Sequence, residues 1–127
     1  MTRFLIVAAG GALGAVARYG VGRLLPASGW PWGTLAVNVV GGLVMGLLTG
    51  WLAFRAGAQG ESIRLFAAVG VLGGFTTFSA FSLETALMIE RRQFATAGGY
   101  VAASVVLSIA ALFLGLMVAR RAFGAAL

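Results

Sequence analysis

The sequence contains no cysteine, histidine, lysine or aspartate among its 127 residues. Disulfides, thiolate nucleophiles, imidazole bases and metal sites built from cysteine and histidine are therefore excluded. The acidic residues are Glu61, Glu84 and Glu90, which are too few for a carboxylate metal cage within one chain. Because most protein catalysis needs a side chain that titrates, attacks or ligates near neutral pH, we predict that the protein is not an enzyme.

Charge is also scarce. Only 9% of the residues are charged and 61% are hydrophobic, whereas a soluble domain carries about a quarter charged residues. The net charge of +6 comes from nine arginines, which stand singly or in pairs between apolar runs. They form no stripe of the kind that binds nucleic acid, and their positions are typical of anchors at a membrane edge. We therefore predict a protein of the lipid bilayer that binds neither nucleic acid nor nucleotides.

Four apolar stretches are each long enough to cross a hydrocarbon core of about 30 Å. They cover residues 4–25, 32–54, 65–89 and 94–118, and the connections between them are short. We predict an all-α membrane protein, a single four-helix transmembrane domain over residues 1–127. Glycines at four-residue spacing predict close helix contacts; they are Gly10 and Gly14, Gly42, Gly46 and Gly50, and Gly70 and Gly74.

The arginine count orients the spans only weakly. Five arginines flank the side that holds both termini, against three or four on the other side. Such a small bias permits insertion in both directions, and thus antiparallel pairing of two copies, but it also permits one fixed orientation.

Polar groups occur inside the apolar stretches. Asn38 lies in the second stretch, and a buried amide there needs a partner, either a neighbouring helix or a passing ion. The third stretch has the sequence GGFTTFS at residues 73–79, which favours either a helix break or an intact helix whose hydroxyls bond to the preceding turn. A break would free backbone carbonyls for protein, water or an ion.

Aromatic and hydroxyl side chains recur at helical spacing. Phe78 and Phe81 fall on one helix face, where they either pack in a core or turn their partly positive ring edges to an anion. Tyr100, Ser104 and Ser108 follow at successive turns of the fourth stretch and form a track of hydroxyl donors.

With these motifs in their order, the chain resembles the Fluc (CrcB) family of fluoride channels over essentially its whole length. The motifs are GAVARY at residues 14–19, GTLAVN at 33–38, and GGFTTFS at 73–79 with Phe81 and Glu84 after it. The resemblance implies an antiparallel, dual-topology homodimer whose third helix is broken near its centre. It also implies passive fluoride export that relieves cytoplasmic fluoride toxicity across a bacterial inner membrane, and a structural Na⁺ at the dimer centre.

The resemblance further assigns site residues. Asn38 would donate its amide hydrogens to fluoride, and Phe78 and Phe81 would offer it their ring edges. The other expected pore residues are Thr34, Tyr100, Ser104 and Ser108; Arg18 would line the vestibule, and the carbonyls of Gly73 and Thr76 would hold Na⁺. Ala80 stands where family members often have threonine, and we expect altered conductance or packing there.

Two other functions are compatible with four small helices. A proton-coupled exporter of the small multidrug resistance type needs a carboxylate deep in the membrane. The first stretch has none, and we expect Glu84 to snorkel or to pair with Arg91 or Arg92. The other alternative is a non-transporting assembly subunit held together by its glycine contacts.

Overall fold

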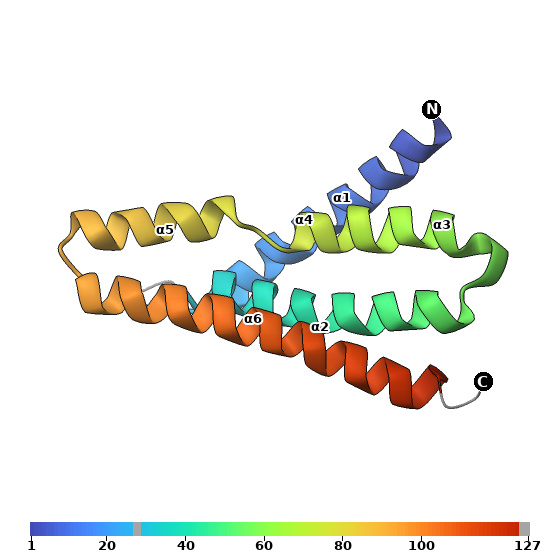
Figure 1. The fold of residues 1–127 in the computed structure, drawn as a ribbon. Helices are drawn as coiled ribbons and strands as arrows, with labels where there is room; N and C mark the ends of the chain where they lie inside the picture. Colours follow the sequence, from blue (N-terminus) through green and yellow to red (C-terminus); the bar gives the residue numbers. More distant parts are fainter. Residues whose placement is uncertain (27–28, 125–127) are drawn as a thin grey trace.

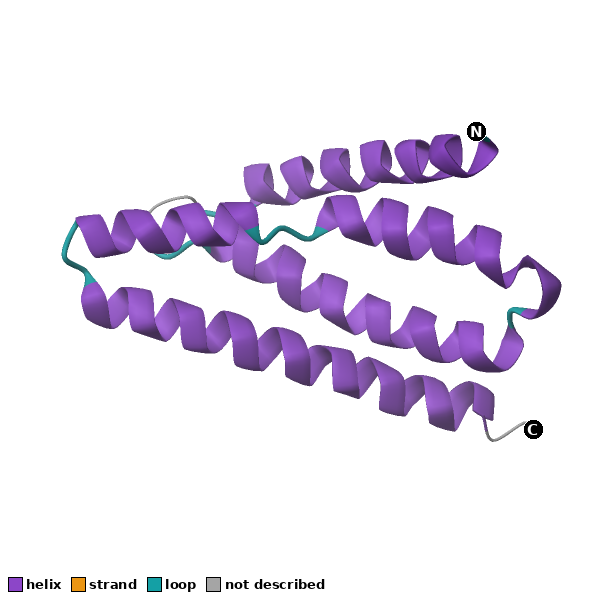
Figure 2. Ribbon diagram, turned by 45° about the horizontal axis from the view of Figure 1, so that its top comes forward, coloured by secondary structure: helices purple, strands orange, loops and turns teal. Residues whose placement is uncertain are grey.

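The computed structural model describes residues 1–26 and 29–124. Four long helical rods run back and forth, and the N-terminus and the end of the fourth rod lie at the same end of the molecule (Figures 1 and 2). All four rods are long and apolar enough to cross a membrane, which confirms the four predicted spans. The bounds are α1 Thr2–Leu24, α2 Trp32–Arg55, η1 Gly57–Gln59, α3 Gly60–Ile63, η2 Arg64–Leu72, α4 Gly73–Phe75, α5 Ser79–Glu90 and α6 Phe94–Phe123.

The rods are longer than the apolar stretches. Helix α6 continues past residue 118 to Phe123 and includes Arg120 and Arg121, because arginine is a good helix former and can extend its charge to water. The third rod begins at Gly57, and its η2 segment is a π-helix of nine residues. π-Helices are rare and usually one turn long, and no pattern in the sequence predicted this one.

The predicted break in the third rod is confirmed. Residues 76–78 are not helical, and the backbone at Thr76 is extended, with φ −86° and ψ 159°. The break follows the glycine pair instead of coinciding with it. Gly74 stays helical and lies against α1, where an added Cβ would come within 2.5 Å of the Gly11 carbonyl oxygen. The teal segment between α4 and α5 in Figure 2 is this break.

Glycine contacts hold the rods together, as the four-residue spacing predicted. Helix α1 packs along η2 and α4, and α2 packs along α6. A side chain at Gly14 would collide with the backbone of Val71, and one at Gly46 with the backbone of Leu112. The other predicted positions also face a neighbouring rod closely, at Gly10, Gly42, Gly50, Gly70 and Gly74.

A small core lies where α2, α5 and α6 meet. Leu35, Met88, Ala97 and Tyr100 are buried there, and Phe81 is among the side chains that pack against them. Most other large apolar side chains are exposed on the outside of the rods, as expected for surfaces that face lipid or a second chain.

Candidate functional site

A groove of about 440 Å³ runs beside the break in the third rod. It lies between α2, the break, the start of α5 and the middle of α6. Five of the seven expected pore residues line it, namely Asn38, Phe78, Phe81, Ser104 and Ser108. The fold therefore brings together side chains that are up to 70 positions apart in the sequence (108 − 38).

Asn38 joins α2 to the break. Its Nδ2 donates to the Thr77 carbonyl oxygen at 2.9 Å, and its Oδ1 accepts from the Thr77 backbone N–H at 2.8 Å. The amide thus satisfies the peptide N–H and carbonyl of Thr77, which lies in the break of the neighbouring rod. This agrees with the first interpretation of the sequence, in which Asn38 bonds a neighbouring rod. An amide nitrogen has two hydrogens, and the second has no partner among the described residues.

The break diverts two backbone donors from their usual helical acceptors. In an unbroken helix the Thr77 N–H would bond to the Gly73 carbonyl and the Ala80 N–H to the Thr76 carbonyl. Instead, Thr77 donates to Asn38, and the Ala80 N–H donates to the Thr77 hydroxyl at 3.1 Å. The carbonyls of Gly73 and Thr76 are therefore the two that lose these donors.

The phenylalanine pair divides between the core and the surface. The rings of Phe78 and Phe81 have centroids 5.6 Å apart, and Phe81 lies 5.2 Å from the ring of Tyr100 in the core. Phe78 is 78% exposed in the single chain. Phe81 therefore contributes to packing as well as to the groove wall, whereas Phe78 is left for another molecule to cover.

Two serine hydroxyls of α6 face the groove without a partner. The Oγ atoms of Ser104 and Ser108 are buried, and within residues 1–26 and 29–124 neither has a hydrogen-bond partner. Serine and threonine in helices often bond to the preceding turn, as Thr85 does with the Phe81 carbonyl at 2.8 Å. A buried hydroxyl without a partner lowers the free energy of unfolding by about 1–3 kcal/mol. An acceptor from outside the described chain would remove this cost.

Thr34 and Tyr100 do not line this groove, and Thr34 lines the second cavity described below. Both donate to the carboxylate of Glu84: Thr34 Oγ1 to Oε2 and Tyr100 OH to Oε1, each at 2.8 Å. The hydrogens of these two hydroxyls therefore bond to Glu84 inside the bundle.

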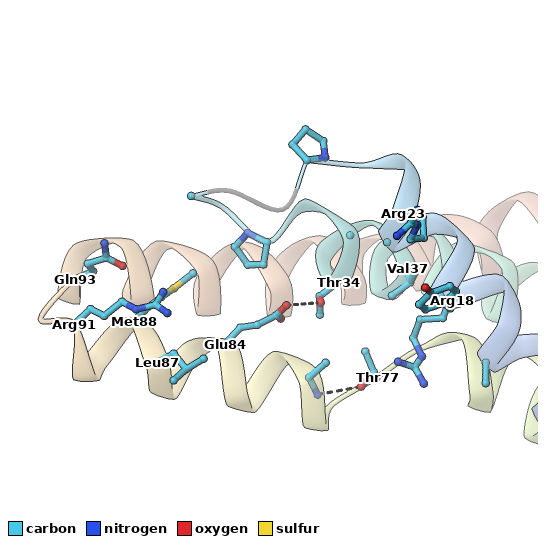
Figure 3. A pocket seen from close by; sticks show the side chains of 18 residues that line it. Arg18, Arg23, Thr34, Val37, Thr77, Glu84, Leu87, Met88, Arg91 and Gln93 are labelled. Carbon is cyan, nitrogen blue, oxygen red and sulfur yellow. Dashed lines mark hydrogen bonds between the residues drawn. The ribbon is translucent and has the colours of Figure 1, made fainter.

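Glu84 is the residue whose position the sequence analysis missed. In the described part of the chain it forms no ion pair with Arg91 or Arg92, in contrast to our expectation. Its side chain accepts a hydrogen bond from Thr34 on α2, which Figure 3 shows, and another from Tyr100 on α6. Helical spacing gave a usable signal, because Glu84 lies three residues after Phe81 and so shares its face.

A second, polar cavity of about 580 Å³ adjoins the break from the side of α1. It is lined by the C-terminal half of α1, the start of α2 and the C-terminal half of α5. Its charged residues are Arg18, Arg23, Arg91 and Glu84 (Figure 3). Arg18 also donates from Nε to the Gly74 carbonyl at 3.1 Å, which fixes the base of its guanidinium beside the break. Thr77 lines both cavities.

Comparison with known proteins gives a consistent set of relatives. The family model described as CrcB-like protein, Camphor Resistance (CrcB), matches residues 5–116. A protein of Caulobacter sp. (strain K31) named fluoride-specific ion channel FluC is 64% identical, with 97% of this chain and 98% of that protein covered. Proteins of the same name from Caulobacter vibrioides (strain NA1000 / CB15N) and Hyphomonas neptunium are 60% and 57% identical, each with 97% of this chain and 99% of the relative covered.

Proposed function

The chain belongs to the CrcB family, which confirms the resemblance found in its motifs, and on this basis we propose that it is a fluoride-specific ion channel. The observation that carries the proposal is the groove beside the broken helix. Ser104 and Ser108, whose hydroxyls have no partner among the described residues, line it together with Phe78, which is exposed in the single chain.

Fluoride is small and tightly hydrated, so a selective pore must replace its water with donors that hold it weakly enough to let it leave. We propose that the hydroxyls of Ser104 and Ser108 donate to the ion, together with the second amide hydrogen of Asn38. The ring edges of Phe78 and Phe81 add partial positive charge without a full cation. No arginine lines this groove, which fits passage better than tight binding.

The groove is open along one side of the chain, and this supports a second copy as its cover. Polar groups with a hydrogen left over, such as the amide of Asn38, are costly where they face lipid. A 78% exposed Phe78 beside them offers an apolar surface for contact. We propose that an antiparallel copy of the chain covers the groove, so that each pore is lined by two subunits.

The carbonyls of Gly73 and Thr76 are among those that lose their helical donors at the break, and they are suited to a Na⁺ ion. Carbonyl oxygens are hard ligands, and broken helices in membranes present them to cations. We propose that Gly73 and Thr76 of each subunit would hold this Na⁺, which would supply positive charge to balance the carbonyl dipoles at the dimer centre. A higher thermal unfolding midpoint in Na⁺ than in K⁺ is expected for the detergent-solubilised protein, and equal midpoints would count against the site.

We propose that transport is passive and runs down the electrochemical gradient of fluoride. The chain would then lie in a bacterial inner membrane and relieve fluoride toxicity by export. Nothing in this mechanism needs a nucleotide or a proton carrier, since passage down a gradient needs only the weak donors and ring edges of the groove.

Fluoride efflux from liposomes that contain the purified protein tests the channel proposal. We expect fast fluoride efflux, negligible chloride efflux, and severe loss of fluoride efflux for Phe78→Ile. Phe113→Ile is the matched control, because Phe113 is 61% exposed on α6 and does not line the groove. Equal efflux of the two halides, or equal effects of the two substitutions, would contradict the proposed pore.

Topology can be tested separately because the sequence has no cysteine. A single Gln59→Cys substitution places a thiol in the exposed η1 turn at the start of the third rod. Dual topology predicts that an impermeant thiol reagent labels part of the protein from each side of the membrane. Labelling from one side alone would rule it out.

A further inference from the structure

We propose that the 580 Å³ cavity beside the break binds a phosphate-type oxyanion, either free inorganic phosphate or a lipid headgroup, and that the bound oxyanion slows fluoride entry. This inference rests on the proposed channel function. It concerns a ligand much larger than fluoride and residues outside the groove.

The charges on the cavity wall favour a polyatomic anion. Three guanidinium groups line it, against the single carboxylate of Glu84. Both oxygens of that carboxylate already accept hydrogen bonds from Thr34 and Tyr100, so it is held against α2 and α6. None of the three arginines forms an ion pair within the described residues. The cavity therefore has an excess of positive charge that nothing in the described chain neutralises.

The geometry of arginine also favours an oxyanion over a halide. The planar guanidinium presents parallel N–H groups that match two oxygens of one phosphate. Arg18 uses its Nε for the Gly74 carbonyl, which fixes its position and leaves its terminal N–H groups for a ligand. Figure 3 shows Arg23 above it on α1 and Arg91 beyond Glu84, just after the end of α5. A cavity of this volume easily holds a phosphate group, whereas a single fluoride would leave most of it to water.

The position of the cavity connects binding to transport. Thr77, whose peptide is held by Asn38, forms part of the wall of both the cavity and the groove. An oxyanion at Arg18 and Arg23 would lie beside this shared wall and neutralise the positive potential that draws fluoride inward. Fluoride would then approach the groove against the charge of a bound anion.

The test measures fluoride efflux from liposomes of neutral phosphatidylcholine with and without inorganic phosphate in the bath, at constant ionic strength adjusted with chloride. We expect phosphate to slow wild-type efflux. We expect Arg23→Gln to need about five times more phosphate for the same inhibition. This ratio corresponds to the free energy of one exposed ion pair. Arg121→Gln is the matched control, because Arg121 is exposed near the end of α6 and does not line the cavity.

A second arm distinguishes the two sources of the phosphate group. If the headgroup occupies the cavity, wild-type efflux should be slower from liposomes with added phosphatidylglycerol and no free phosphate. Arg23→Gln should relieve this inhibition. Inhibition only in the free-phosphate arm assigns the site to the inorganic ion. No inhibition in either arm, or equal inhibition of wild type, Arg23→Gln and Arg121→Gln, would overturn the proposal.

Calorimetric titration of the solubilised protein with inorganic phosphate separates this inference from the channel proposal. A heat of phosphate binding supports the site if Arg23→Gln weakens the binding and Arg121→Gln does not. This holds even if fluoride efflux is absent. Fast, selective efflux in phosphate-free buffer with no heat of phosphate binding and no inhibition would retain the channel and reject the oxyanion site.

Discussion

Replacement of Asn38 should destabilise the broken helix more than any change in its own hydroxyls. Asn38→Ala removes both hydrogen bonds to Thr77, at 2.9 and 2.8 Å, and leaves a peptide N–H and a carbonyl without partners inside the bundle. Each such group costs about 1–3 kcal/mol, so the free energy of unfolding should fall by about 2–6 kcal/mol. Asn38→Asp keeps the acceptor for the Thr77 N–H but points an ionised oxygen at the Thr77 carbonyl, so its loss should be at least as large.

Equilibrium unfolding in mixed detergent micelles measures these differences, with fluoride efflux as a second measurement on the same variants. Ser82→Ala is the matched control, because its hydroxyl bonds to the Phe78 carbonyl at 2.9 Å on the same segment. That carbonyl also accepts the Ser82 backbone N–H at 2.8 Å, so the control should change stability by about 0.5 kcal/mol or less. If Asn38→Ala were no less stable than Ser82→Ala, the amide would not hold the break, and our account of it would be refuted.

Further predictions concern the helix contacts, the groove and the carboxylate. Gly14→Leu should prevent stable folding, because its side chain would meet the backbone of η2. Gly11→Leu should fold, because no atom lies within 4 Å of a Cβ added there. Size-exclusion chromatography compares the two variants. Ser108→Ala should lower fluoride efflux while leaving the unfolding free energy equal or higher, because its hydroxyl has no partner in the described chain; lower stability would contradict this. Tyr100→Phe keeps the buried ring but removes the donor to Glu84, and detergent unfolding should show a loss of about 1–3 kcal/mol.

Periodic and compositional features of the fold were predictable from the sequence. The four spans follow from hydropathy alone, and the glycine contacts follow from the rule that backbones approach closely in lipid only where side chains are small. The break was one of two open interpretations. What decides it is a contact between distant residues, since the amide of Asn38 replaces the helical partners of Thr77.

The candidate site was predictable in its membership and less so in its arrangement. Asn38, Phe78, Phe81, Ser104 and Ser108 do gather around one groove. The hydroxyls of Thr34 and Tyr100 turn the other way because the two carboxyl oxygens of Glu84 accept hydrogen bonds from them. The direction in which Glu84 points depends on the rotation of α5 after the break, which no local pattern fixes.

The two serines of α6 carry the argument for a ligand further than the aromatic pair does. Phe81 packs against Tyr100 and would be useful to the fold even if no ion passed. The hydroxyls of Ser104 and Ser108 have no such structural use, because the described chain gives them no bond and alanine in their place would remove two buried polar groups. Both serines line the same groove as Asn38, whose amide has one hydrogen without a partner in the described chain. Three residues that each have a donor to spare line one groove, and this supports the proposal that an anion accepts from them as it passes.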